Sequence, residues 1–234
     1  SLSNVIFKGL LENIEGDAFD NTAWISTSSS EFVMLGGTTL LKYNGSSESV
    51  TVPYGVKTIA SNAFLYNANV KEIILPDTVQ KIGDNAFLHC YSLEKIEIPS
   101  SVSHIGAGAF DDTIWMYNKP GDFVTVNGIL ISYKGEEKHV ELPSGITAIG
   151  SGAFMANENL LSVHLSDSVI YIDSMAFGGC SELRLLNIPD SVEWIDEYAF
   201  TGCKKMTIHG SLKSYAQNFA SHMSIPYSTP VFVS

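Results

Sequence analysis

The chain has 234 residues, and its 45% hydrophobic content is enough to bury a substantial core and excludes a disordered or low-complexity protein. Its formal net charge of −12 at pH 7 disfavours nucleic acid or anionic lipid as a partner, because both require a basic face. No stretch approaches the roughly 18 apolar residues of a spanning helix, so we expect no membrane insertion. No signal peptide is recognisable, and the chain starts almost at its first repeat, so we expect a mature chain or a piece of a longer repeat protein.

Phenylalanine recurs along the whole chain with one period. The spacing is 23 residues, or nearly twice 23, between the members of the series Phe19, Phe64, Phe87, Phe110, Phe154, Phe177 and Phe200. The unit that ends at Phe110 begins at Leu93 and reads L-x-x-I-x-I-P-x-x-V-x-x-I-G-x-x-A-F. A repeat of this length predicts a solenoid, in which each coil buries its apolar residues against its neighbours. Such proteins usually function by binding.

Each coil has a predicted order of elements. Ile96 and Ile98 lie two residues apart, as in a strand with one buried face, and Pro99 ends that strand. A serine or aspartate two residues before the Ala-Phe pair, such as Asp84, predicts the N-cap of a single helical turn, with the phenylalanine in the coil centre. Because identical apolar positions are buried by stacking, we expect a single parallel sheet formed by strands at residues 70–75, 93–98, 160–165 and 183–188.

Two longer intervals carry a second repeated element. In each, two short apolar segments flank a glycine, Gly37 or Gly128, which predicts a β-hairpin that replaces one coil. We expect the aromatic residues that the two intervals share to pack in the interior: Trp24, Trp115, Tyr43 and Tyr133. The predicted organisation is one repeat domain, residues 1–234, with module one at 1–108 (hairpin 20–49), module two at 109–203 (hairpin 111–139) and a C-terminal cap at 204–234.

The repeated unit resembles the BspA-like class of leucine-rich repeats, which is found in bacterial surface proteins, and the resemblance covers nearly the entire chain. The segment from Met206 to Tyr227 also resembles the closing segment of that family, a last strand and a short helix over the open end of the solenoid. The resemblance implies a leucine-rich-repeat solenoid, a β-rich right-handed superhelix that is formally α/β, with 23-residue coils. It also implies an extracellular or cell-surface location, and it transfers no catalytic residue.

Cysteines and histidines give no sign of a reactive site. Cys90, Cys180 and Cys203 each lie three residues after a repeat phenylalanine, which favours small buried thiols. A Cys180–Cys203 disulfide is the alternative, because equivalent positions on adjacent coils lie roughly 5 Å apart. The six histidines fall at different repeat positions, so we expect neither one loop nor one column to gather them into a metal ligand set: His89, His104, His139, His164, His209 and His222. The chain contains no H-E-x-x-H, C-x-x-C, phosphate-loop or G-x-S-x-G motif, and we expect neither an enzyme nor a cofactor.

The last two coils differ from the others at equivalent surface positions. Where the first module has polar residues such as Gln80 and Lys81, these coils have five apolar or aromatic ones, namely Ile170, Tyr171, Met175, Trp194 and Tyr198. One interpretation is that residues 221–234 fold back and cover them. The other is an exposed aromatic platform that binds a protein or glycan.

The predicted function is that of a non-catalytic bacterial cell-surface or secreted interaction protein. The resemblance implies an adhesin-type module, expected as a monomer, that binds a host, matrix or other surface protein. The alternative is a structural spacer domain of a larger surface protein, with no ligand of its own. A third possibility is a carbohydrate-active or glycan-binding protein, and the catalytic form of it would need paired carboxylates in a cleft.

Overall fold

The computed structural model describes residues 22, 25 and 27–229, and the chain divides into two compact units, Ser1–Lys119 (unit 1) and Pro120–Ser234 (unit 2). The first predicted repeat copy, residues 2–19, lies outside the described residues, as do Trp24 and residues 230–234. The division of the sequence into modules at residues 108 and 109 stays a prediction.

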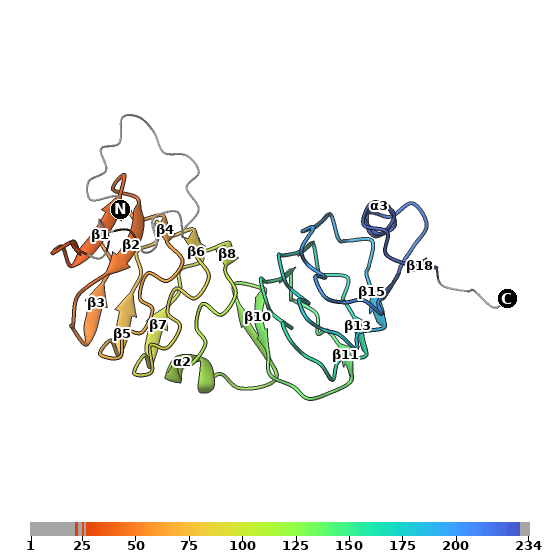
Figure 1. Ribbon diagram of the computed structural model, residues 1–234, viewed down its shortest axis with the longest axis horizontal. Coiled ribbons are helices and arrows are strands. Elements are labelled where there is room, and N and C mark those ends of the chain that lie inside the picture. Colours follow the sequence, from red (N-terminus) through yellow and green to blue (C-terminus); the bar gives the residue numbers. More distant parts are fainter. Residues whose placement is uncertain (1–21, 23–24, 26, 230–234) are drawn as a thin grey trace. The chain divides into compact units, whose positions relative to one another are not determined.

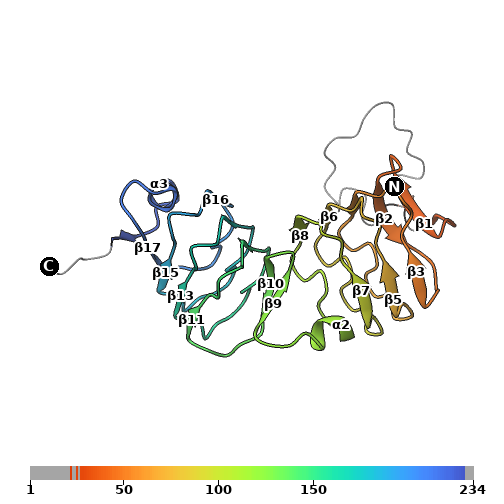
Figure 2. The ribbon, with the colours of Figure 1, turned by 180° about the vertical axis from the view of Figure 1, so that it is seen from behind.

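Unit 1 contains one five-stranded sheet and one three-stranded sheet. Figures 1 and 2 show them from opposite sides. The first begins with an antiparallel hairpin and continues with parallel strands, in the order β1 (Phe32–Leu35), β2 (Thr39–Tyr43), β4 (Thr58–Ile59), β6 (Lys81–Ile82) and β8 (His104–Ile105). The second is parallel, in the order β3 (Ser49–Thr51), β5 (Glu72–Ile74) and β7 (Lys95–Glu97). Paired residues such as Ile73 and Ile96 differ by one 23-residue repeat, so each coil adds one strand to each sheet.

Unit 2 repeats this plan with two five-stranded sheets. The first sheet has the order β16 (Trp194–Ile195), β14 (Tyr171–Ile172), β12 (Ala148–Ile149), β10 (Ile129–Tyr133) and β9 (Phe123–Val126), and β9 and β10 form its antiparallel hairpin. The second sheet is parallel, in the order β11 (His139–Glu141), β13 (Ser162–His164), β15 (Leu185–Asn187), β17 (Thr207–His209) and β18 (Tyr227–Ser228).

Helix α3 (Tyr215–His222) lies at the C-terminal end of unit 2, beside β16 and β17 (Figure 2). Its N-cap is Ser214, whose hydroxyl accepts a hydrogen bond from the backbone N–H of Gln217. The Phe219 ring packs edge-on against Phe200, with 5.9 Å between the ring centroids. The helix thereby continues the stack of repeat phenylalanines where no further coil follows in the described chain.

The core of each unit is a column of stacked aromatic rings. In unit 1, Phe64, Phe87 and Phe110 are buried, and consecutive ring centroids lie 5.1 and 5.2 Å apart. In unit 2, Phe154 and Phe177 are buried and stack at 4.8 Å. The hairpin coils supply the next ring, because Tyr43 and Tyr133 lie 5.0 Å from Phe64 and Phe154, respectively, and Trp115 stacks on Phe110. The predicted interior positions of Tyr43 and Trp115 are confirmed, whereas Tyr133 is only partly buried.

The prediction of a single sheet for the four strand segments is wrong. Residues 70–75 and 93–98 supply β5 and β7 of unit 1, whereas 160–165 and 183–188 supply β13 and β15 of a different sheet in unit 2. After β8, helix α2 (Ile114–Tyr117) lies where the next coil would supply another strand of the β3–β5–β7 sheet, and the Trp115 N–H donates to the Leu93 carbonyl. The Thr113 hydroxyl caps α2 by accepting from the Met116 N–H. Because the backbone of α2 forms the hydrogen bonds of a helical turn, α2 adds no strand to the β3–β5–β7 sheet, and this sheet ends at β7.

The predicted N-capped helical turn before each repeat phenylalanine is also wrong. Asn62 and Tyr66 both have left-handed backbone, with φ of 62°, and the same two positions are left-handed in the following coil. Every second N–H in this turn donates to the next coil, as from Phe64 to the Ala86 carbonyl at 2.8 Å. Asp84 follows this pattern, since its carboxylate accepts from the Ala107 N–H one coil further on and does not cap its own turn. Contacts between coils therefore shape the turn.

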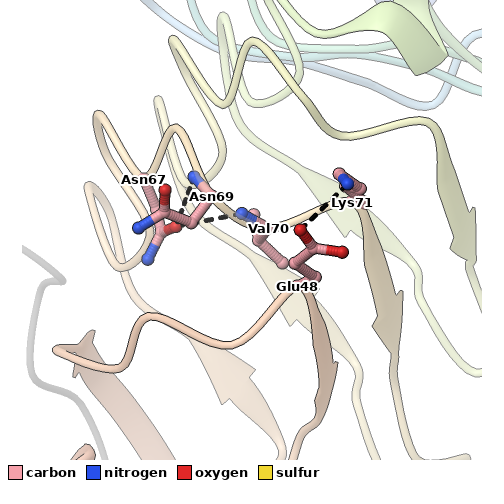
Figure 3. A network of polar contacts seen from close by, with 5 residues as sticks. All are labelled: Glu48, Asn67, Asn69, Val70 and Lys71. Carbon is pink, nitrogen blue, oxygen red and sulfur yellow. Dashed lines mark hydrogen bonds and ion pairs between the residues drawn. The ribbon is translucent and has the colours of Figure 1, made fainter.

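An asparagine closes the turn that precedes β5. The Asn67 side-chain oxygen accepts hydrogen bonds from the backbone N–H groups of Asn69 and Val70, at 3.3 and 3.2 Å (Figure 3). Its amide nitrogen donates to the Gly45 carbonyl of the preceding coil at 3.1 Å. The next residue, Lys71, forms an ion pair with Glu48 on the neighbouring coil, at 2.9 Å. Asn67 thus links its own coil to the preceding coil and positions the start of β5.

Candidate functional site

The five residues singled out from the last two coils, here called the C-terminal aromatic cluster, lie on unit 2. Strands β14 and β16 place Tyr171 opposite Trp194, with 5.5 Å between the ring centroids and 50° between the ring planes. The Ile170 carbonyl accepts from the Glu193 N–H at 2.8 Å, so Ile170 lies beside this pair. Ile170 is 47% exposed and Trp194 is 44% exposed. The structure therefore brings Ile170, Tyr171 and Trp194 together on the adjacent strands β14 and β16 and the residue before β14.

Met175 and Tyr198 lie on the turns that follow these strands. Met175 has left-handed backbone, with φ of 54°, and its side chain lies over Gly178. The Tyr198 N–H donates to the Asp196 carboxylate at 2.9 Å, and its side chain is 58% exposed. These two residues occupy one equivalent turn position on adjacent coils, next to but separate from the Tyr171–Trp194 pair along the chain.

Tyr171 is held as a protonated hydrogen-bond donor. Its hydroxyl donates to the Asp173 carboxylate at 3.1 Å, and Asp173 is buried. Partial burial, together with the negative charge of Asp173, raises the pKa of Tyr171. The same carboxylate accepts from the Ser174 N–H at 2.7 Å. The ring therefore has a fixed orientation beside Trp194, which reduces the entropy that a partner would have to remove.

The described part of the C-terminal segment lies on the other sheet. β18 pairs with β17, with Tyr227 opposite Ile208, and the Tyr227 hydroxyl donates to the Ser211 carbonyl at 2.7 Å. Tyr227 and Ser228 thus extend the β11–β18 sheet, whereas the aromatic pair belongs to the sheet of β14 and β16. The rest of the segment proposed as a cover, residues 230–234, lies outside the described residues.

His164 and His209 share one column of the β11–β18 sheet, so the six histidines do not all occupy different repeat positions. His164, Asn187 and His209 are paired across adjacent strands, and His139 lies on β11 of the same sheet. The Nδ1 atom of His164 lies 2.9 Å from the Asn187 amide nitrogen, and that of His209 lies 2.8 Å from the Ser228 hydroxyl. The last coil is one residue short, with 22 residues from Asn187 to His209 (209 − 187), so a comparison at a fixed period of 23 misses the alignment.

Where the structure describes the chain, the histidine, cysteine and carboxylate side chains form no group of three or more that could hold a metal ion. Among those residues there is likewise no helix with the length and apolar character needed to span a membrane.

All three cysteines are free, and the interpretation as buried thiols holds for Cys90 and Cys180. Each Sγ–H donates to the carbonyl of the repeat phenylalanine on the preceding coil: Cys90 to Phe64, Cys180 to Phe154 and Cys203 to Phe177, at 3.0 to 3.1 Å. Burial raises the pKa of Cys90 to about 12, so this thiol stays protonated. Cys203 is partly exposed, and the structure contains no Cys180–Cys203 disulfide.

A second surface cluster, on unit 1, escaped the sequence comparison. It consists of Tyr66, His89, Tyr91 and Asp112 and is called the unit 1 turn cluster below. The Tyr66 and His89 rings stack with 4.6 Å between centroids, and the His89 Nδ1 atom lies 2.8 Å from the Asp112 carboxylate. The available signal was the position two residues after each repeat phenylalanine, where unit 1 has Tyr, His and Asp and unit 2 has Ala156, Gly179 and Gly202.

Comparison with known families identifies the repeat. The profile of the BspA type leucine rich repeat region matches residues 1–116 and 132–226, in six copies. The chain belongs to this family. The predicted leucine-rich-repeat solenoid with 23-residue coils is confirmed. No functionally curated protein matches the chain.

Solved structures similar to this BspA-type chain are bacterial leucine-rich repeat proteins. The leucine rich repeat protein of T. pallidum is 23% identical, over 81% of this chain and 89% of its own, with a TM-score of 0.39. A leucine rich cell surface protein from Faecalibacterium prausnitzii is 23% identical over 73% and 62%, with a TM-score of 0.30. The pneumococcal vaccine antigen PcpA is 19% identical over 83% and 44%, with a TM-score of 0.36. Because each TM-score is below 0.5, the family assignment rests on the repeat profile.

Proposed function

We propose that this chain is a non-catalytic interaction module of a bacterial cell-surface or secreted protein, and that it binds a protein partner through the C-terminal aromatic cluster. The observation that carries the proposal is the exposure of Ile170, Trp194 and Tyr198, which are 44 to 58% exposed. Contiguous exposed apolar side chains are uncommon on a monomer unless they bind something. Tryptophan and tyrosine are also the residues most enriched in the energetic centres of protein interfaces.

The comparison between coils supports the same proposal. The strand position of Tyr171 and Trp194 is occupied in unit 1 by Thr58, Lys81 and His104, with the same parallel pairing. The solenoid therefore accepts polar residues at this position. Two large aromatic residues there are not required by the fold, which favours a role in recognition.

A surface location is part of this proposal. It is supported by the BspA-type repeat and by the similarity to a leucine rich cell surface protein. An adhesin-type module would bind a host, matrix or other surface protein. The competing function is that of a spacer domain, which would leave the aromatic cluster without a ligand.

Trp194→Lys tests the proposal, because lysine already occupies the equivalent position as Lys81 and suits the strand. The probe is a panel of purified extracellular matrix proteins, with binding to the intact chain measured by surface plasmon resonance. We expect at least one member to bind, and Trp194→Lys to weaken it about tenfold or more, as for an interface hot spot. The melting temperature should stay within a few degrees of the wild type, since a residue this exposed adds little to the core.

Tyr54→Lys is the matched control, because Tyr54 is 82% exposed on unit 1 and lies outside the cluster. It should bind like the wild type. If the wild-type chain binds no panel member, or if both substitutions reduce binding equally, the spacer function is favoured and the cluster is not the binding surface.

A further inference from the structure

The unit 1 turn cluster presents ordered aromatic rings at the surface. Tyr66 and His89 stack nearly parallel, with 23° between the ring planes, and the Tyr91 ring lies 5.4 Å from His89 at 30°. Tyr66 is 64% exposed and Tyr91 is 54% exposed. The rings therefore fix one another without being buried, and a large part of their surface remains available to a ligand.

Polar groups are built into the same stack. The His89 Nδ1 atom contacts the Asp112 carboxylate at 2.8 Å and lies 3.1 Å from the Tyr91 hydroxyl. Asp112 occupies the position of His89 on the next coil, and His89 that of Tyr66, so the three side chains form one column. Hydroxyl, imidazole and carboxylate together can both donate and accept hydrogen bonds.

The backbone under the column is left-handed at non-glycine residues. Tyr66, His89 and Asp112 have φ of 62°, 60° and 59°. In unit 2 the same column contains Ala156 and then Gly179 and Gly202, the residue type that adopts this conformation most readily. The coil thus folds without these three side chains, and their retention in a strained conformation points to a role in binding.

We infer that the unit 1 turn cluster binds a neutral saccharide, with the sugar ring packed on the tyrosines and its hydroxyls bonded to the polar groups of the column. A sugar has apolar C–H faces and a rim of hydroxyls, so it fits aromatic surface edged by mixed donors and acceptors. The Asp112 carboxylate already has the imidazole as its partner, which weakens its attraction for a cationic peptide. An anionic ligand is disfavoured by the chain's net charge of −12.

This inference is independent of the proposed protein-binding function, because the residues belong to unit 1 and the proposed protein surface belongs to unit 2. One site can therefore fail its test while the other passes.

The experiment measures binding of neutral tetrasaccharides to the intact chain. The probes are tetrasaccharides of glucose, mannose, galactose and N-acetylglucosamine. Their binding is measured by saturation-transfer NMR and by calorimetric titration. We expect at least one to bind with a Kd between about 0.1 and 10 mM, the range of a small, shallow site.

Tyr66→Asn and His89→Asn remove the column while keeping the backbone, because this chain already uses asparagine in left-handed conformation at Asn62 and Asn85. Each should weaken saccharide binding about tenfold or more, equivalent to the loss of one main contact. The melting temperature should not fall. Tyr54→Asn, at an 82% exposed tyrosine outside the column, should bind like the wild type.

Three results would overturn the inference. The first is that none of the four tetrasaccharides binds at about 10 mM, the weak limit of the expected range. The second is that Tyr66→Asn binds with unchanged affinity. The third is that a hexa-arginine peptide binds in their place and loses affinity in Asp112→Asn, which would identify the column as a site for cationic peptides.

Discussion

The two units use one coil plan but carry different chemistry on equivalent sheets. On the β3–β5–β7 sheet of unit 1, Lys95 forms an ion pair with Glu72 at 2.6 Å, and Lys71 pairs with Glu48. On the β11–β18 sheet of unit 2, the cross-strand contacts join imidazoles to neutral polar groups, as between His139 and Ser162 at 2.8 Å. The intervening residues are buried in both sheets. The buried half of the pattern therefore determines the coil, and the outer half is free to determine what the surface binds.

The same division applies to the aromatic surfaces. Unit 2 has its surface aromatic pair on strands, with Trp194 exposed and Tyr171 partly buried, where unit 1 has polar residues. Unit 1 has its surface rings on turns, with Tyr66 exposed and His89 partly buried, where unit 2 has alanine and glycine. Neither set is demanded by the repeat, so each unit can have acquired its own ligand on a common scaffold.

The largest expected effect tests whether the two cores are equivalent. Phe87→Ala and Phe177→Ala each remove a fully buried ring from the aromatic column, one in each unit. Each should lower the free energy of unfolding by about 3 to 5 kcal/mol, as for a phenylalanine truncated in a core. Urea denaturation followed by tryptophan fluorescence and circular dichroism measures the change. A loss below about 1 kcal/mol in one variant alone would show that the two columns are not energetically equivalent.

A smaller effect of opposite sign tests the left-handed column. Ala156 has φ of 58°, is exposed, and is followed on the next coil by Gly179 at the same position. Ala156→Gly should raise the free energy of unfolding by about 0.5 to 1 kcal/mol, because glycine avoids the steric cost of this conformation. Thermal and urea unfolding both report it. Ala153→Gly is the control and should be destabilising, since Ala153 is buried and its φ is not left-handed.

The smallest effect concerns the ion pair of the unit 1 sheet. Glu72 accepts a hydrogen bond from Lys95 and is attracted by its charge, and both interactions lower the pKa of Glu72 below its ordinary value of 4.5. A lowered carboxyl pKa stabilises the fold above the ordinary pKa, and this contribution is lost as the pH falls through the lowered value. Lys95 is exposed and Glu72 is partly exposed, so the effect should be small and reduced by salt.

Urea unfolding of the wild type and Glu72→Gln between pH 6 and pH 2 measures this contribution. The difference between them should shrink towards the acid end and in 1 M salt, where the Debye length is about 3 Å. The matched change in unit 2, Ser162→Ala, removes no charge and should show no such acid dependence. A difference that is constant with pH would show that the pair contributes nothing through ionisation.

The coil, its period and its core could be predicted because each depends on buried residues that recur every 23 positions. The repeat positions of Phe64 and Ile96 have the same role in every coil, so the role found for one coil applies to the equivalent residues of the others. The end of the sheet after β7 was missed because the same apolar positions return at residues 160–165 and 183–188, which suggested that all four strands stack in one sheet. The only local sign was Thr113, which is an effective N-cap, and a single cap residue is a weak signal beside a strong repeat.

The surface sites were predicted only where they disturb the strand pattern. Tyr171 and Trp194 stand out because strand positions alternate, and a fixed period aligns them. The column of Tyr66 and His89 lies in a turn whose left-handed backbone depends on hydrogen bonds to the next coil, such as Tyr66 N–H to the Leu88 carbonyl. No single coil encodes that geometry. The row of His164 and His209 was hidden because one coil is shortened, which shifts every later residue by one position.

The buried thiols affect how the chain matures. Before the coils stack, Cys90 and Cys180 are ordinary reactive thiols, and an oxidising compartment could pair them wrongly. Once stacked, each Sγ–H is bonded to the carbonyl of the preceding coil, and burial keeps the sulfur protonated and out of reach of oxidants. The step that stacks these coils is thus also the step that makes the two thiols unreactive, so oxidation before folding and oxidation after folding should give different products.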